Sequence, residues 1–298
     1  GKPSRYFNSA SVRPYNDFGI RLSMLLPADS VERAQALIDR SKLSGFSIPP
    51  ATAYFLVTSD AARSSRAAFF PKSGRIPKLK LTIKAIQADS IEGVNDIMFY
   101  QTGLVTVPKL ETLGFLPGAL ADHLTSSGGD LLGTGQMSSL RWLEAGATAS
   151  YGTVSEPCSF PQKFPNASVL LLHYLAGASA VEAYWKSVLM PGQGVFVGEP
   201  LERAGEVAGL ARPGPLGWAA TGKTAREAVA EFEEEFPQVL HQRGFEVGFR
   251  HSILRPQAKE LENIRIADSQ IQFRYLHAFL QHGCQLLFVL LLPLTPPL

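Results

Sequence analysis

The stretch GALADHLTSSGGDLLGTGQMSSLRWLEAGATASYGTVSEPC, from Gly118 to Cys158, decides the predicted fold. A short apolar run over Gly118–Leu124 breaks into a turn of small residues, and Ala147–Val154 forms a second apolar run. Between them, apolar residues at helical spacing predict a helix that starts near Gln136 and ends at Gly146, because glycine commonly follows a helix end. Strand, helix and strand in this order predict one right-handed βαβ unit with two parallel strands.

Polar side chains follow both predicted strands of this unit. They are Asp122, His123, Thr125 and Ser126 after the first strand, and Glu156 and Cys158 after the second. Parallel strands end at the same edge of a sheet, and open α/β sheets place their ligands at that edge. We therefore expect these side chains to converge on one polar site.

Composition places the chain among globular proteins with a sizeable core, since it has 298 residues, of which 45% are hydrophobic and 18% are charged. The 28 basic and 26 acidic residues give a net charge of +2, which is too balanced to indicate a nucleic-acid partner or an anionic membrane surface. Only Cys158 and Cys284 are present, which excludes a disulfide framework.

No apolar run reaches the roughly 18–20 residues of a membrane-spanning helix, so we predict no transmembrane helix. The longest such run, Leu286–Leu292, is instead typical of a buried strand. The sequence begins with Gly1 rather than Met, which indicates a processed or truncated chain whose signal peptide is not visible.

The remaining segments alternate between strand and helix patterns. Strands are predicted at Ile20–Leu26, Ala51–Val57, Asn95–Tyr100 and Val195–Val197, and helices at Val31–Lys42, Ala167–Ala176 and Ala180–Leu189. This alternation predicts a three-layer α/β sandwich with a mainly parallel central sheet over residues 1–201. Residues 202–222 are rich in Gly, Ala and Pro and indicate a linker, and residues 223–298 form a C-terminal extension in which Gln257–His282 is expected to be partly helical.

Several segments together carry a resemblance to a known family. They are PGALADHLTSSGG (Pro117–Gly129), QMSSLRWLEAGATASYGTVSEPC (Gln136–Cys158), QKFP (Gln162–Pro165), EAYWKSV (Glu182–Val188) and PGQGVFVGEPL (Pro191–Leu201). With these segments the chain resembles a family of uncharacterised bacterial exported proteins, some of which carry PEP-CTERM sorting tails. The resemblance covers about residues 5–201. It implies a periplasmic or extracellular location and brings no established activity.

A more distant similarity joins the strand, the small-residue turn and LEAGATASYGTV (Leu143–Val154) to caspase-like cysteine peptidases of the gingipain type. Such enzymes place a His and a Cys after neighbouring strands. In this chain the corresponding hypothesis makes Cys158 the nucleophile and His123 the base, with Glu156 or Asp122 orienting the imidazole ring. The alternative is that Cys158 is a small buried residue and His123 a core histidine.

The same four residues have donor types that suit zinc, but none of them shows the i, i+4 spacing of a helical metal site, and we predict no metal. Gly128 and Gly129 offer backbone amides to an anion beside Thr125 and Ser126, or they form a plain turn. The glycine pattern matches neither G-x-G-x-x-G nor a Walker sequence, so no cofactor is predicted. Two functions stay open: an exported protein that binds a small-molecule or peptide ligand, and a cysteine hydrolase.

Overall fold

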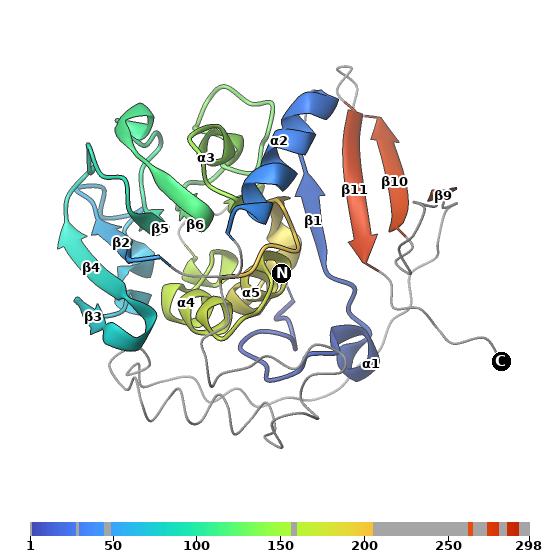
Figure 1. The fold of residues 1–298 in the computed structure, drawn as a ribbon, viewed down its shortest axis with the longest axis horizontal. Helices are drawn as coiled ribbons and strands as arrows, with labels where there is room; N and C mark the ends of the chain where they lie inside the picture. Colours follow the sequence, from blue (N-terminus) through green and yellow to red (C-terminus); the bar gives the residue numbers. More distant parts are fainter. Residues whose placement is uncertain are drawn as a thin grey trace.

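The computed structural model of the chain describes residues 2–27, 30–44, 49–155 and 160–204, together with the backbone of three further strands between residues 262 and 291. A single sheet runs through this structure (Figure 1). Its strands lie in the order β3 (Gly74–Ile76), β4 (Leu81–Gln87), β2 (Ala51–Val57), β5 (Ile97–Thr102), β6 (Phe115–His123), β7 (Ala149–Thr153), β8 (Gly194–Gly198) and β1 (Ser23–Leu26), followed by β11 (Gln285–Leu291), β10 (Phe273–Phe279) and β9 (Glu262–Ile264).

The middle of the sheet is parallel, as the sequence predicts. Strands β4, β2, β5, β6 and β7 pair with one another in parallel, and β6 and β7 meet at Leu120 and Ala149. Strand β8 then pairs antiparallel with β7, and β1 pairs parallel with β8. The prediction of an α/β fold with a mainly parallel sheet is therefore confirmed. Strand direction reverses between β7 and β8, and antiparallel pairs also lie at the two ends of the sheet, between β3 and β4 and from β1 through β11 and β10 to β9.

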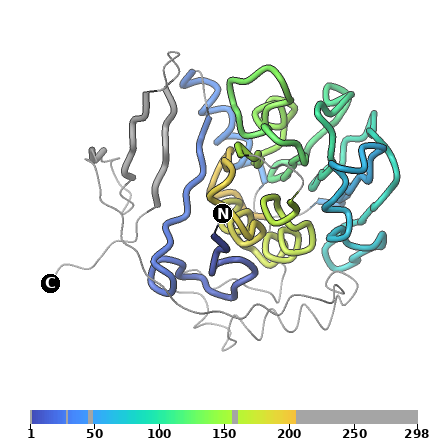
Figure 2. The backbone as a smooth tube through the Cα atoms, turned by 180° about the vertical axis from the view of Figure 1, so that it is seen from behind, coloured from blue at the N-terminus to red at the C-terminus, as the bar shows by residue number. Residues whose placement is uncertain are grey.

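Helices cover both faces of the sheet, which gives the predicted three layers. They are α2 (Val31–Lys42) and α3 (Leu140–Glu144) on one face, α4 (Ala167–Leu175) and α5 (Ala180–Ser187) on the other, and the short α1 (Pro14–Phe18) near the N-terminus. Seen from behind in Figure 2, the strands β3 and β4 and the segment from β1 to α2 lie at opposite ends of the α4–α5 pair. Short 3₁₀ turns are η1 (Ser65–Phe69), η2 (Pro77–Leu79), η3 (Leu110–Thr112), η4 (Pro161–Lys163) and η5 (Pro191–Gln193).

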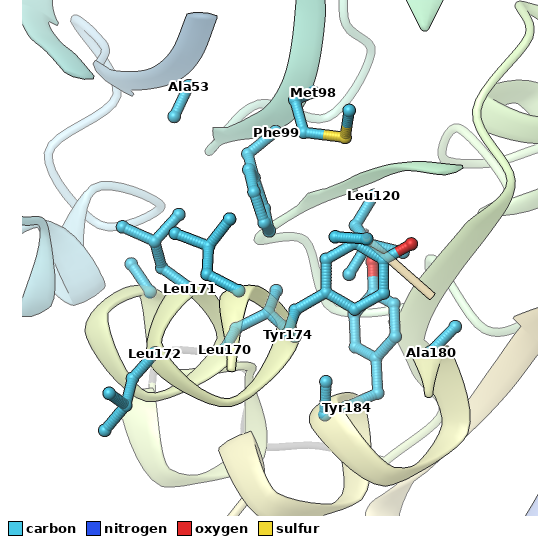
Figure 3. Close-up of a cluster of buried hydrophobic side chains, with 14 of the residues drawn as sticks. Ala53, Met98, Phe99, Leu120, Leu170, Leu171, Leu172, Tyr174, Ala180 and Tyr184 are labelled. Atoms are coloured by element: carbon cyan, nitrogen blue, oxygen red, sulfur yellow. The ribbon is translucent and has the colours of Figure 1, made fainter. Parts of the chain in front are cut away.

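Alternate side chains of each central strand enter opposite cores, as strand geometry requires. Phe55 of β2 belongs to the cluster beneath α4 and α5, whereas its neighbour Tyr54 belongs to the cluster on the α3 face. Figure 3 shows Tyr174 of α4 and Tyr184 of α5 pointing toward the sheet. Because both faces of the strands are covered, their sequences are almost continuously apolar rather than alternating.

The helix boundaries follow from their capping residues. Ser30 accepts a hydrogen bond from the backbone N–H of Arg33 at the start of α2, and Asn166 does the same for Val169 in α4. Ser179 and Glu182 form a capping box at the start of α5. The predicted helix near Gln136 is shorter than expected and starts only at Leu140, because the preceding residues form a loop above the strand ends.

The predicted C-terminal extension is described only in part. Within Gln257–His282, which is predicted to be partly helical, residues 262–264 and 273–279 are strands. The second of these pairs with the apolar strand β11, and such pairing can override local helix propensity. The predicted strand at Leu286–Leu292 corresponds to β11. Residues 202–204 of the predicted linker are described, with Glu202 and Ala204 buried, and the other residues of the predicted linker and extension lie outside the described part of the chain.

Candidate functional site

The carboxyl ends of β2, β5, β6 and β7 meet at one edge of the sheet, because these strands are parallel neighbours. We call this the strand-end edge and define it by the residues that directly follow those four strands. The prediction that the two strands of the βαβ unit are parallel is thus confirmed. Glu156 and Cys158 lie outside the described residues, so their convergence with His123 stays a prediction.

Asp122 lies beneath the strand-end edge rather than on it. Its carboxylate forms an ion pair with Arg66 of η1, and its Oδ2 atom accepts a hydrogen bond of 2.9 Å from Nε2 of Gln101. Burial raises the pKa of Asp122, and the charge of Arg66 and the hydrogen bond from Gln101 oppose that rise. The carboxylate therefore serves a buried ion pair that joins η1 to β6.

His123 points to the opposite face from Asp122, because consecutive residues of a strand alternate. Its Nδ1 atom accepts a hydrogen bond of 2.9 Å from the indole N–H of Trp142 in α3. The structure therefore does not bring Asp122 and His123 together as an orienting carboxylate and its base.

The same hydrogen bond fixes the protonation of the His123 ring. Since Nδ1 acts as an acceptor, the neutral ring carries its hydrogen on Nε2. Burial, together with the nearby charge of Arg66, lowers the pKa of His123 to about 3. A general base needs a free lone pair, and in this arrangement the only lone pair of the ring is directed at Trp142.

Thr125 connects the end of β6 to two other segments. Its hydroxyl accepts a hydrogen bond of 3.2 Å from Nε of Arg63 and donates one of 2.8 Å to Oε1 of Gln136. Oε1 of Gln136 also accepts the backbone N–H of Ser127 at 2.8 Å. Ser126 is buried, and its carbonyl accepts a hydrogen bond from the hydroxyl of Thr153 in β7.

Arg63 and Asp60, in the segment that follows β2, are two charged groups beside the strand-end edge that reach solvent. The Nη1 atom of Arg63 lies 2.7 Å from Oδ2 of Asp60, and the Arg63 side chain is 23% exposed. Hydrogen bonds from the backbone and the guanidinium of Arg63 lower the pKa of Asp60. Gly103, just after β5, allows the close approach of this segment, since a Cβ atom there would lie 2.0 Å from the carbonyl oxygen of Arg63.

Gly129 and Gly152 allow the loop after β6 to pack closely against β7, whereas a Cβ atom on Gly128 would meet its nearest atom, a methyl group of Thr125, at 3.3 Å. A Cβ atom on Gly129 would lie 2.4 Å from the carbonyl oxygen of Gly152, and one on Gly152 would lie 2.2 Å from the carbonyl carbon of Gly128. The anion hypothesis requires a free backbone amide at Gly129. This amide instead donates a hydrogen bond of 2.8 Å to the carbonyl of Thr153. Gly129 thus has a packing role that is sufficient to account for it.

Sequence reasoning placed Thr125 at this edge but assigned no role to Asp60, Arg63 or Gln136. A signal for the first two was present, because the run TSDAAR (Thr58–Arg63) directly follows the predicted strand Ala51–Val57. Polar residues after a buried parallel strand are expected at the ligand edge. Gln136 had no such signal, since its contact depends on how the preceding loop folds back.

The described part of the chain contains no helix that is long and apolar enough to cross a membrane. It also contains no group of three or more His, Cys, Asp or Glu side chains arranged to hold a metal ion. In comparisons with models of protein families, with curated proteins and with solved structures, nothing matched this chain, so the contacts of the strand-end edge carry the functional inference.

Proposed function

We propose that the chain is a binding protein that takes a small anionic ligand, or the anionic end of a peptide, at its strand-end edge. The observation that carries this proposal is the run of hydrogen bonds from Asp60 through Arg63 and Thr125 to Gln136. It holds a partly exposed guanidinium at the carboxyl ends of parallel strands, where α/β proteins bind their ligands.

The Arg63 guanidinium has five N–H donors. Within the described residues, its hydrogen bonds to Asp60 and Thr125 engage two of them, so other donors are available to a ligand. A fixed guanidinium of this kind suits carboxylate or phosphate groups, because its planar donors match their oxygen atoms and little side-chain freedom is lost on binding.

The local charge also favours an anion. Residues 61–88 contain seven Lys and Arg residues and no Asp or Glu, whereas the whole chain has a net charge of only +2. Arg63 and Arg66 begin this basic segment, although Arg66 is paired with buried Asp122. Of the other cations, Arg75 lies on β3, Lys84 lies on β4, and Lys72, Lys78 and Lys80 lie in the segments that precede these two strands. A concentration of one sign of charge raises the local concentration of oppositely charged ligands.

An experiment with simple anions tests the proposal. We expect inorganic phosphate or acetate to raise the melting temperature of the wild-type chain in a saturable way, since a ligand that binds only the native state stabilises it. Arg63→Gln should lose this saturable part. Arg75→Gln is the matched control, because Arg75 is an exposed cation of the same basic segment and lies on β3.

The comparison of the two variants separates binding from the general stabilising effect of such salts, which acts on any protein surface. Equal stabilisation of the wild type, Arg63→Gln and Arg75→Gln would contradict a site at Arg63.

The resemblance to exported bacterial proteins supports a further element of the proposal, that the protein meets its ligand in the periplasm or outside the cell.

A further inference from the structure

Two buried carboxyl groups share one hydroxyl group at the edge of the sheet opposite the strand-end edge. Ser41, in the last turn of α2, forms hydrogen bonds with Oε2 of Glu199, at 3.0 Å, and with Oε2 of Glu202. Glu199 directly follows β8, which runs antiparallel to β7 and therefore ends where β7 begins. The contact thus ties α2 to the end of β8.

Counting protons shows what this contact requires. A serine hydroxyl has one hydrogen, so Ser41 can donate to only one of the two carboxyl oxygens. If both glutamates were ionised, the second contact would place two oxygen atoms together without a hydrogen between them. One proton on either carboxyl group completes both hydrogen bonds, because Ser41 then accepts from the protonated acid and donates to the ionised one.

Both acids also accept hydrogen bonds from the backbone. Their Oε1 atoms accept backbone N–H groups, Glu199 from Leu201 at 3.1 Å and Glu202 from Arg203 at 2.9 Å. Exposure is 8% for Glu199 and 3% for Glu202, so both side chains are largely withdrawn from water.

The neighbouring elements α2 and α4 place further charged and polar side chains close to the two acids. Arg40 of α2 directs its Nη1 atom to the carbonyls of Leu143 and Ala147, at 3.2 and 3.1 Å. Tyr174 of α4 donates its hydroxyl to the carbonyl of Gly118, and its pKa is raised well above the ordinary value by burial and by the two glutamates. Ser44, after α2, adds a second hydroxyl contact to Glu202.

We propose that Ser41, Glu199 and Glu202 form a proton-dependent clasp, which retains one carboxyl proton at pH values where exposed glutamates are ionised and weakens the attachment of α2 when that proton leaves. The two acids titrate as a coupled pair, so the apparent values belong to the pair rather than to either residue. The clasp is independent of the proposed ligand site.

The direction of the pH effect follows from linkage. Burial raises the pKa of both Glu199 and Glu202 above the ordinary value of an exposed glutamate, about 4.3. Above that pH the native chain therefore holds more protons than the unfolded chain, and stability falls as pH rises. The contribution of the clasp is complete below the unfolded value and is lost as pH rises through the native value.

Thermal unfolding of the full chain between pH 5 and pH 9 tests the clasp. Each unit by which the native pKa of the pair exceeds the unfolded one makes the clasp contribute a fall of about 3–5 °C in melting temperature as pH rises from the unfolded to the native value. His123 acts in the opposite direction below about pH 6.5, so the clasp is measured as the difference between the wild type and its variants at each pH. Glu199→Gln and Glu202→Gln should each reduce that fall, because the amide N–H₂ donates to Ser41 without needing a proton. Glu111→Gln, an exposed acid on η3, should keep the wild-type fall.

A second measurement does not depend on the variants folding. In the wild-type chain with ¹³C-labelled glutamate carboxyl groups, we expect at least one carboxyl carbon to titrate above the others. The clasp is overturned if every glutamate titrates in the ordinary range, or if both Gln variants fold and lose stability with pH as steeply as Glu111→Gln.

Discussion

Arg66 and Asp122 form an ion pair that is closed off from water, with each side chain 1% exposed. The guanidinium also donates from Nη2 to the carbonyl oxygens of Thr102 and Asp122, at 2.9 and 3.1 Å. One side chain from η1 thereby binds the last residues of β5 and β6, just beneath the strand-end edge. This buried contact therefore fixes the ends of β5 and β6 relative to η1.

Removal of one partner should be costly. We expect Arg66→Met to lower the free energy of unfolding by about 3–5 kcal/mol, because it leaves the Asp122 carboxylate buried without its counter-charge. Urea unfolding measures the change. Arg75→Met, an exposed cation on β3, should stay within about 0.5 kcal/mol of the wild type.

The double variant Arg66→Met with Asp122→Leu gives the complementary test. With both charges gone, no group is left unpaired, and most of the lost stability should return. If Arg66→Met alone lowered the free energy of unfolding by less than about 1 kcal/mol, the buried ion pair would not be a major support of the strand ends.

His123 should stay neutral far into the acid range. We expect the Hε1 resonance of His123, identified by its absence in His123→Gln, to show no titration step between pH 8 and pH 4, since its pKa is about 3. The unfolded chain binds a proton near the ordinary value of about 6.5, so stability falls as pH drops from there toward 3. A step near pH 6.5 in the native chain would show that the ring is not buried against Trp142.

Gly152→Ala should damage the packing between β7 and the loop that follows β6. The new Cβ atom would meet backbone atoms of Gly128 and Gly129 at 2.2 and 2.3 Å, and backbone cannot move aside as a flexible side chain can. We expect a loss of about 3 kcal/mol, at the upper end for overpacking. Gly74→Ala on β3 is the matched control, because a Cβ atom there meets nothing within 4 Å.

The cysteine hydrolase hypothesis predicts an activated thiol at Cys158. The lone pair of the His123 ring is engaged by Trp142, so we expect no activation. In a Cys284→Ser background, Cys158 should react with a thiol probe no faster than free cysteine, and His123→Gln should leave the rate unchanged. Rapid labelling that His123→Gln abolishes would restore the catalytic pair.

Local patterns were sufficient to predict most of the fold. The capping residues Ser30, Asn166 and Ser179 located three helices, because a capped helix start depends only on neighbouring residues. The end of α3 was also predictable, since Gly146 adopts a φ of 116°, which favours glycine. Strand order and the reversal at β8 depend on pairing between distant segments, which periodicity does not reveal.

The candidate site was less predictable from the sequence than the fold. Asp122 and His123 were correctly placed at the end of a strand, but alternation sends their side chains to opposite faces, one to Arg66 and the other to Trp142. A similar limit applies to Val31, which fits the apolar face of its helix and yet is 77% exposed. Spacing shows which residues share an element and does not show what packs against them.

The reversal between β7 and β8 places Arg63 and the Glu199–Glu202 clasp at opposite edges of the sheet. The length of β7, from Ala149 to Thr153, separates the two edges by roughly 15 Å at the usual rise per residue. Groups so far apart, with no partner in common, contribute additively to the free energy of unfolding. A chain carrying both Arg63→Gln and Glu199→Gln should therefore show the sum of the two separate effects, which makes acid response and anion affinity two properties that can be engineered one at a time.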